Sequence, residues 1–177
     1  MRPPEQLETS RLSLRPPRLE DATWIFESYA QDPDVTKYLV WQPHKSMIET
    51  TAYLARCISA WENETAFPWV IIRKDNSQPI GVIEIRINEY KVDMGYVLSK
   101  AEWGKGYMPE AAERVVKWAV DQAEIYRVWA VCDVENHASA RVMEKVGMKR
   151  EGILKRWIKH PNISEEPRDC YCYAKVK

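Results

Sequence analysis

The sequence predicts an α/β (α+β) fold in which helices flank one twisted, mixed β-sheet. Segments with strand periodicity alternate with segments with helical periodicity, in the order βααβββαβαββ. A strand, a glycine-containing loop, a helix and another strand follow one another near the middle of the chain. The 177 residues contain no internal repeat and no long linker, so we expect one domain over residues 1–177.

The first predicted elements are a strand and an amphipathic helix. In residues 11–15, Leu12 and Leu14 alternate with polar side chains and are expected to point into the core. Residues 18–31 place apolar side chains, beginning with Leu19, at intervals of three or four. This spacing predicts a helix with one buried face.

A second helix and three strands are expected next. Ser46 followed by Glu49 is a capping-box pattern, which predicts a helix that starts there and ends near Glu62. The residues beyond it alternate or form short apolar runs separated by turn-forming residues, which is typical of strands. These strands are expected at residues 66–74, 79–87 and 91–99.

The second half of the chain continues the alternation. A helix is expected from Pro109 onward, because proline is tolerated in a first helical turn. A short helix from Asn136 is expected to end before Gly147, a normal C-terminal glycine. Strands are expected at residues 127–134, 148–158 and 169–177. The last of these fits an exposed edge, which would allow a homodimer, as well as an interior position.

The composition excludes several classes of protein. The 26 basic and 26 acidic residues cancel, which argues against a nucleic-acid binder held by phosphate neutralisation. The chain lacks an apolar run long enough for a signal peptide or a membrane span, so we expect a cytoplasmic protein without a membrane partner. Its four cysteines form no CxxC pair, and we expect no metal site and no disulfide framework.

Two of the six glycines stand close together at Gly104 and Gly106, directly before a predicted helix. Glycines at such a turn let backbone N–H groups converge at the helix start, where they can bind an anion such as phosphate. A tight turn that binds nothing is the alternative. The P-loop pattern fails here, since Gly106 is followed by Tyr107 and Met108. A dinucleotide site, with Asp133 as its ribose-binding acid, and a coenzyme A pyrophosphate site both stay open.

The stretch "WGKGYMPEA" resembles the pyrophosphate loop of the GNAT superfamily of N-acetyltransferases, whose pattern is Gln/Arg-x-x-Gly-x-Gly/Ala. Gly106 falls on the central glycine, whereas Trp103 and Met108 depart from the pattern. Three further stretches look like the opening, the second coenzyme A contact helix and the closing strand of the RimJ/RimL type, which contains ribosomal-protein N-terminal acetyltransferases. They are "LETSRLSLR", "NHASARVMEKVGM" and "DCYCY", so the resemblance covers about residues 7–175.

The resemblance implies transfer of acetyl from acetyl-CoA to a primary amine by direct attack in a ternary complex. It implies that the backbone N–H of Val97 polarises the acetyl carbonyl, while Leu98 and Ser99 pair with the pantetheine amides. Asn136 would hydrogen-bond the pantetheine arm, and Ser139 would approach the coenzyme A sulfur as the acid. The pyrophosphate would be held by the loop residues Trp103, Gly104, Lys105, Gly106, Tyr107 and Met108.

One departure from the superfamily concerns the acid. Many members have a tyrosine directly before the "EKxG" turn, but here that residue is Met143. The resemblance to the RimJ/RimL type implies Ser139 as the acid instead, with helix capping at its first turn as the alternative role. For the base, Glu84 and Asp93 are candidates, and Glu84 acting through water is our choice. A solvated carboxylate, or one paired with Arg86, is the structural alternative.

The acceptor side has fewer signals. Tyr38 and Trp41 lie in the segment that covers the acceptor in this fold, and we expect them to line it unless they are ordinary core aromatics. An N-terminal α-amine of a protein or peptide is the acceptor we expect. A small-molecule amine such as a polyamine, amino acid or drug is the first alternative. A non-catalytic acyl-CoA-binding module, suggested by Met143 and Trp103, is the second.

Overall fold

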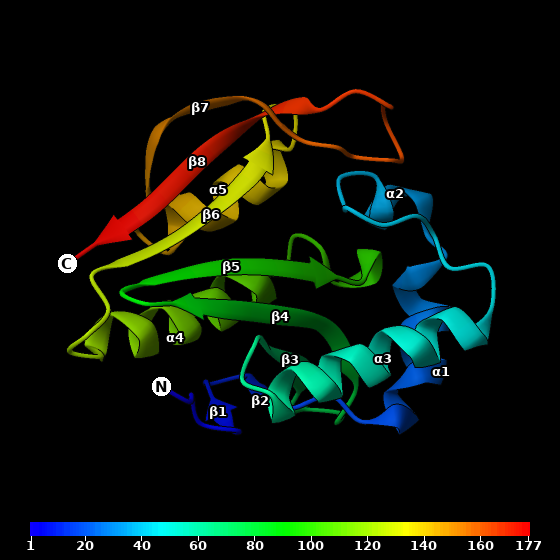
Figure 1. Cartoon of the computed structure of the whole chain (residues 1–177). Helices are drawn as coiled ribbons and strands as arrows, with labels where there is room; N and C mark the ends of the chain where they lie inside the picture. Colours follow the sequence, from blue (N-terminus) through cyan, green and yellow to red (C-terminus); the bar gives the residue numbers. More distant parts are fainter.

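The sheet is the organising element of the protein, and the computed structural model describes it together with all of residues 1–177. Eight strands lie in the order β1-β2-β3-β4-β5-β6-β8-β7 (Figure 1). All neighbours are antiparallel except β5 and β6, which are parallel. The strands are β1 (Leu7–Glu8), β2 (Leu12–Arg15), β3 (Phe67–Arg73), β4 (Pro79–Asn88), β5 (Lys91–Leu98), β6 (Arg127–Asp133), β7 (Lys149–Ile158) and β8 (Arg168–Val176).

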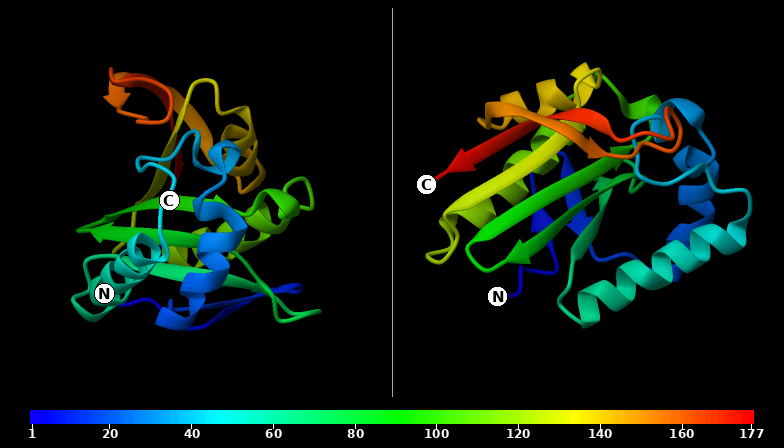
Figure 2. Two further views of the ribbon diagram at one scale, coloured as in Figure 1. Left: turned by 90° about the vertical axis from the view of Figure 1, so that its right-hand side faces the viewer. Right: turned by 45° about the horizontal axis from the view of Figure 1, so that its top comes forward.

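Helices cover both faces of this sheet, which confirms the predicted fold class. In Figure 1 and Figure 2, α4 and α5 lie on one face and α1 and α3 on the other. The main core of 28 buried residues joins the sheet to α4 and α5, and a second cluster of six joins α1 to α3. The helices are α1 (Ala22–Ile25), α2 (Pro33–Thr36), α3 (Met47–Glu62), α4 (Tyr107–Asp121) and α5 (His137–Lys145), with single turns at Leu19–Asp21, Phe26–Ala30 and Lys100–Glu102.

Most predicted elements are present, and Leu12 and Leu14 are fully buried as expected. The helix predicted over residues 18–31 is wrong in detail, because it is divided into a 3-10 turn, α1 and a π turn. Leu19 is 51% exposed, since it lies in the opening 3-10 turn rather than on the buried face. β1 and α2 were not predicted, because two-residue and four-residue elements carry no periodicity.

The capping box at the start of α3 is also wrong, although the helix begins and ends where expected. The side chain of Ser46 accepts no hydrogen bond from the helix. The Glu49 carboxylate instead accepts a 2.9 Å hydrogen bond from the backbone N–H of Lys45. A carboxylate in the first turn still favours the helix through its dipole.

The position of β8 answers the question left open for the last strand. It lies inside the sheet, with β6 on one side and β7 on the other. The exposed edge on this side of the sheet is β7, most of whose residues are exposed. A homodimer through the edge of the closing strand is therefore excluded, because both edges of β8 are already paired within the chain.

Candidate functional site

The site begins where two parallel strands separate. β5 pairs with β6 only over three residues, from Lys91 to Asp93 on β5, and beyond that point the two strands diverge. β5 stays with β4 and β6 stays with β8 along the whole of β6, so the two halves of the sheet open like a wedge (Figure 1). We call the space between Met94–Leu98 and Ala130–Asp133 the wedge. Backbone groups of β5 that point into it have no strand partner.

The register of β5 determines which backbone groups face the wedge. Ser99 donates its N–H to the carbonyl of Ile80 at 2.9 Å, so this pair is hydrogen-bonded. Hydrogen-bonded pairs alternate with non-bonded pairs along an antiparallel ladder, and the register has no bulge here. The N–H of Val97 therefore points toward β4, and the N–H groups of Tyr96 and Leu98 point into the wedge.

This geometry corrects two of the expected backbone contacts. The N–H groups of Val97 and Ser99 point toward β4, so neither can donate a hydrogen bond to an acyl group in the wedge. Leu98 does face the wedge, but its carbonyl already accepts a 2.9 Å hydrogen bond from the Trp103 indole. Trp103, which departs from the loop pattern, thus ties the glycine loop to the end of β5.

The glycine loop supplies free donors at the start of α4. Gly104 and Gly106 have φ of 78° and 82°, in the left-handed region that favours glycine. The five backbone N–H groups from Gly104 to Met108 donate to no other group of the protein, and the first helical bond is made by Glu110. Converging N–H groups at a helix N-terminus form an anion site. Two of these donors, on Tyr107 and Met108, are ones that any helix start leaves free, and the glycine loop adds three more.

Two ion pairs hold this loop in place. Lys105 lies 3.2 Å from the buried carboxylate of Glu102, which also lies 3.6 Å from Arg73. On the other side, Arg11 donates to Glu110 and to the carbonyl of Lys105. The Arg11 guanidinium also stacks 4.5 Å from the centre of the Tyr107 ring. These contacts fix the loop between β5 and α4 from both sides.

Glu110 connects the start of α4 to the turn between β1 and β2. Its carboxylate accepts hydrogen bonds from the hydroxyls of Thr9 and Ser10 and from the backbone N–H of Arg11. Burial opposes the charged form, but these hydrogen bonds outweigh it and lower the pKa of Glu110 to about 2. The carboxylate is therefore charged at neutral pH and clamps the helix start.

The other side of the wedge is the N-terminus of α5. Asn136 is its N-cap, and its side-chain oxygen accepts the N–H of Ser139 at 3.1 Å. The Ser139 hydroxyl lies 2.8 Å from the hydroxyl of Tyr96, which comes across from β5. Ser139 also faces the thiol of Cys132, whose pKa burial raises to about 12. Ser139 therefore lies near side chains of both diverging strands, Tyr96 of β5 and Cys132 of β6.

Tyr96 is a site residue that the sequence analysis missed. Its hydroxyl lies 3.1 Å from the carbonyl oxygen of Ser139, in addition to its contact with the Ser139 hydroxyl. Burial raises its pKa well above the usual range, so the phenol stays protonated. The sequence signal for Tyr96 is that it directly precedes Val97. Only the pairing register of β4 and β5 shows that the backbone N–H of Tyr96, and not that of Val97, faces the wedge.

The candidate base Glu84 lies on β4, on the face that carries α1 and α3. It makes a 3.0 Å ion pair with Arg86, which also bonds Asp93. The structural alternative for Glu84, pairing with Arg86, is therefore present. Burial nevertheless raises the pKa of Glu84, with Arg86 opposing the shift. A carboxylate with a raised pKa is better suited to take up a proton near neutral pH.

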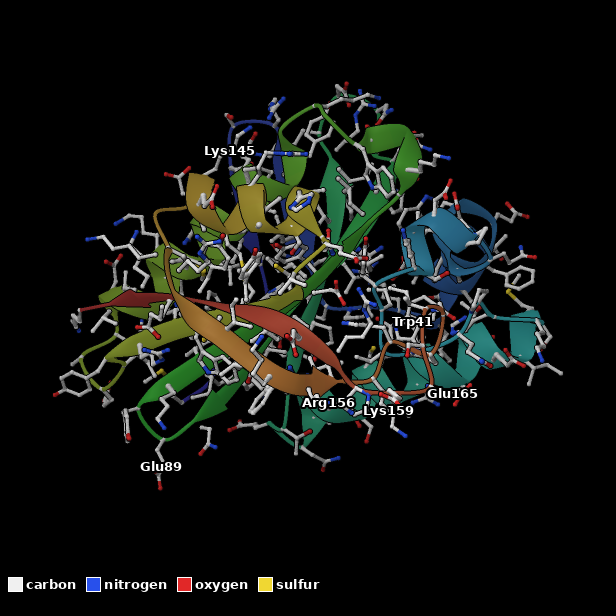
Figure 3. All side chains as sticks on the ribbon, turned by 90° about the horizontal axis from the view of Figure 1, so that it is seen from above. Trp41, Glu89, Lys145, Arg156, Lys159 and Glu165 are labelled. Atoms are coloured by element: carbon white, nitrogen blue, oxygen red, sulfur yellow. The ribbon has the colours of Figure 1, made fainter.

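Tyr38 and Trp41, the two aromatics expected at the acceptor side, contact different parts of the protein. Tyr38 donates a long 3.4 Å hydrogen bond to the carbonyl of Glu135, just before α5. Trp41 stacks 4.9 Å from His44 and packs against the smaller core cluster. Asn162 donates to the carbonyl of Trp41 at 2.8 Å, so the loop between β7 and β8 lies against this segment. Figure 3 shows Trp41 beside that loop, which carries Lys159 and Glu165.

His160 is a second residue that the sequence analysis missed. It is 3% exposed, and neither ring nitrogen has a hydrogen-bond partner. Burial lowers its pKa, although the carboxylate of Asp133 lies 3.7 Å away and opposes the shift. Asp133, proposed from the sequence as a ribose-binding acid, is fully buried and bonded to Arg168 at 2.6 Å. It is therefore not available to a ribose.

The expectations for metals and membranes can be compared with the structure. No group of three or more His, Cys, Asp or Glu side chains is arranged to hold a metal ion. All four cysteines are free and buried. None of the helices combines the length and the apolar character that a membrane crossing requires.

Comparisons with known proteins agree with this geometry. The family model described as "Acetyltransferase (GNAT) domain" matches residues 11–149. The uncharacterized N-acetyltransferase YnaD of Bacillus subtilis is 32% identical over 170 residues, 95% of each chain. The [ribosomal protein uS5]-alanine N-acetyltransferase of Escherichia coli is 25% identical, over 88% of this chain and 84% of its own. This chain belongs to the GNAT family of acetyltransferases.

Solved structures support the same fold. A GNAT-family acetyltransferase from Bacillus anthracis has a TM-score of 0.84 and 29% identity, covering 97% of this chain and 98% of its own. The microcin C7 self-immunity acetyltransferase MccE, solved with acetyl-CoA and AMP, has a TM-score of 0.87 and 22% identity, covering 99% and 98%. Membership of this family favours coenzyme A over a dinucleotide as the ligand of the glycine loop.

Proposed function

We propose that this chain transfers acetyl from acetyl-CoA to the N-terminal α-amine of a protein or peptide. The observation that carries the acetyl-CoA half is the set of five free N–H groups from Gly104 to Met108, at the end of a strand whose own amides face the wedge. A pyrophosphate fits the first set of donors, and an extended amide-containing arm fits the second. The uS5-alanine acetyltransferase relative supports the choice of acceptor.

In the proposed reaction the neutral amine attacks the thioester carbonyl, the C–N bond forms, and the C–S bond breaks with its electron pair on sulfur. The N–H of Tyr96 points into the wedge and takes over the polarising role that the sequence suggested for Val97. Donors aimed at a developing oxyanion are a large catalytic contribution. Leu98 and the side chain of Asn136 hold the pantetheine arm, and Trp103, Lys105 and their neighbours hold the pyrophosphate.

Ser139 is the proposed acid and Glu84 the proposed base. The Ser139 hydroxyl lies between the diverging strands, where the sulfur of a bound thioester would have to be. An α-amine has a pKa near 8, so part of it must lose a proton before it attacks. Glu84 takes up that proton through water, which its raised pKa favours.

The role of Glu84 can be tested by the pH dependence of kcat/KM. A base must be deprotonated, so the rate should fall as pH drops through the raised pKa of Glu84. Glu84→Gln should remove this acidic limb and lower the rate on the order of 100-fold at neutral pH. Glu113→Gln, which changes an exposed carboxylate of α4, is the control. An acidic limb that persists in Glu84→Gln assigns the base elsewhere.

A small-molecule amine is the second candidate acceptor, and one observation favours it. Asn162 bonds the carbonyls of both Thr36 and Trp41, so the loop between β7 and β8 is fastened to the segment after α2. These hydrogen bonds restrict the space through which a protein acceptor would reach the site. Tyr38 and Trp41 border this region in either case.

The experiment that tests the proposal measures thiol release from acetyl-CoA with a panel of amines. Peptides that start with alanine or serine form one arm, and the same peptides with acetylated N-termini are the control. Polyamines, amino acids and aminoglycosides form the other arm. Turnover only with free N-terminal peptides supports the proposal, and turnover only with small amines moves the acceptor to the second candidate. If acetyl-CoA stabilises the protein but no amine gives turnover above buffer, the protein is a binding module.

A further inference from the structure

Met143 on α5 has no group that can donate a proton. A phenol nevertheless reaches the wedge from the opposite side. Tyr96 crosses from β5 to the first turn of α5, where its hydroxyl lies 2.8 Å from that of Ser139. We propose that Tyr96 is a positioning residue that directs the hydroxyl hydrogen of Ser139 toward the sulfur leaving the thioester. This inference rests on the proposed function and deepens it.

The two hydroxyls share two hydrogens between them. The phenol has one hydrogen, and two acceptors of Ser139 lie within reach, the carbonyl at 3.1 Å and the hydroxyl oxygen at 2.8 Å. The carbonyl can only accept, whereas the hydroxyl can accept or donate. If the phenol donates to the carbonyl, the Ser139 hydroxyl can donate to the phenol oxygen. If the phenol donates to the Ser139 hydroxyl, the Ser139 hydrogen is free to point into the wedge.

Charge on the sulfur favours the second arrangement. When the C–S bond breaks, its electron pair stays on sulfur, and the Ser139 hydrogen lowers the energy of that charge by hydrogen bonding to it. The phenol hydrogen then polarises the Ser139 hydroxyl, which strengthens this bond. Tyr96 keeps its own proton, because burial disfavours the phenolate. Its role is therefore to orient Ser139 and not to supply a proton.

Ser139 and Tyr96 are each held in place by a further contact. The backbone of Ser139 is fixed by the Asn136 cap, and Tyr96 lies in the middle of β5, paired with Ile83 of β4. The Cys132 thiol on the remaining side is neutral, since burial raises its pKa to about 12. No charged side chain is bonded to Ser139 or Tyr96. A charge formed on the sulfur would therefore depend on these two hydroxyls.

The test measures the pKa of the coenzyme A thiol bound to the protein, from thiolate absorbance in the ultraviolet. Desulfo-coenzyme A in the same protein provides the baseline. The wild-type protein should lower this pKa below that of free coenzyme A. Tyr96→Phe, which removes only the hydroxyl, should raise it again and lower kcat about tenfold, with the dissociation constant of coenzyme A changed less than threefold.

Two further variants separate orientation from packing. Tyr171→Phe is the matched control, since Tyr171 packs against the same core as Tyr96 and its ring contacts Arg150 instead of Ser139. It should leave the thiol pKa and kcat unchanged. In the Ser139→Ala background, Tyr96→Phe should cause no further change, because the group it orients is gone.

The outcomes are distinguishable. If the wild-type protein fails to bind coenzyme A, the proposed function is wrong. If coenzyme A binds but Tyr96→Phe leaves the thiol pKa unchanged, the role of Tyr96 is overturned and the proposed function stands. Should Tyr96→Phe not fold, Ser139→Ala is measured alone, and an unchanged thiol pKa in that variant overturns the inference equally.

Discussion

The helices that follow the two diverging strands, α4 after β5 and α5 after β6, begin in opposite ways. At α4 the residue before the helix is Gly106, and five consecutive N–H groups are left free. At α5 the Asn136 side chain occupies the N–H of Ser139. The first start is open to an external anion and the second is closed by its own cap. The start of α4 is therefore suited to bind an anion through backbone N–H groups. The start of α5 is suited to hold the side chain of Ser139 in place.

The largest test of this comparison closes the open helix start. Gly106→Val places a β-branched residue at φ of 82°, which L-residues with branched side chains avoid, and its Cβ would lie 3.4 Å from the Arg11 guanidinium that holds the loop. Acetyl-CoA affinity should fall more than about 100-fold by calorimetry. Gly152→Val is the control, because an added Cβ meets nothing there and its φ is not positive. Binding within threefold of wild type would contradict the open-start interpretation.

The next test removes the side chain that the closed start presents. Ser139→Ala should lower kcat on the order of tenfold to 100-fold, since the leaving sulfur loses its hydrogen-bond donor. The acetyl-CoA dissociation constant should stay within threefold, because the pyrophosphate is held at the other helix. Steady-state kinetics and calorimetry together give this separation. An unchanged kcat would reduce Ser139 to a residue of the helix cap.

A third test removes the carboxylate of Glu110, which connects the start of α4 to the turn between β1 and β2. Glu110→Gln removes the charge that accepts three hydrogen bonds from the turn between β1 and β2, and should cost about 1–3 kcal/mol of unfolding free energy at pH 7. The lowered pKa of Glu110 determines how this stabilisation changes with pH. The stabilisation is present above the unfolded pKa of about 4.5 and is lost as pH falls toward about 2. Urea unfolding should therefore show wild type and variant converging in acid.

The smallest effect is expected at the cap of the closed start. Asn136→Ala removes the acceptor for the Ser139 N–H and should cost about 1 kcal/mol of stability. Asn136→Asp, which caps equally well, should retain that stability, so thermal unfolding of both variants separates capping from other roles. Equal destabilisation by alanine and aspartate would show that the cap is not what Asn136 contributes.

Local signals explain what the sequence could predict. The alternation of Leu12 and Leu14, the helical spacing after Pro109 and the paired glycines each reflect a backbone geometry that a few neighbouring residues determine. The cap that Asn136 places on Ser139 is of the same kind, since the two residues are three apart in the chain. Features of this kind are found from sequence because their causes are close in the chain.

The missed features depend on contacts between distant segments. Which of Tyr96 and Val97 faces the wedge is decided by the pairing of Ser99 with Ile80, and a shift of one residue would reverse it. The contact between Tyr96 and Ser139 spans 43 residues. His160 is buried because its loop folds onto the segment after α2, where Asn162 bonds Thr36. No local pattern encodes any of these.

The order of strands at one end of the sheet has a consequence for how the chain folds. β8 follows β7 in sequence but lies between β7 and β6, so β7 has no neighbour in the sheet until β8 has been inserted. During synthesis, the half of the sheet that carries the wedge's second wall is therefore completed last. A chain divided in the loop between residues 158 and 168 would lose the strand that attaches β7 to the sheet, and a peptide of residues 168–176 would have to pair with β6 and β7 together.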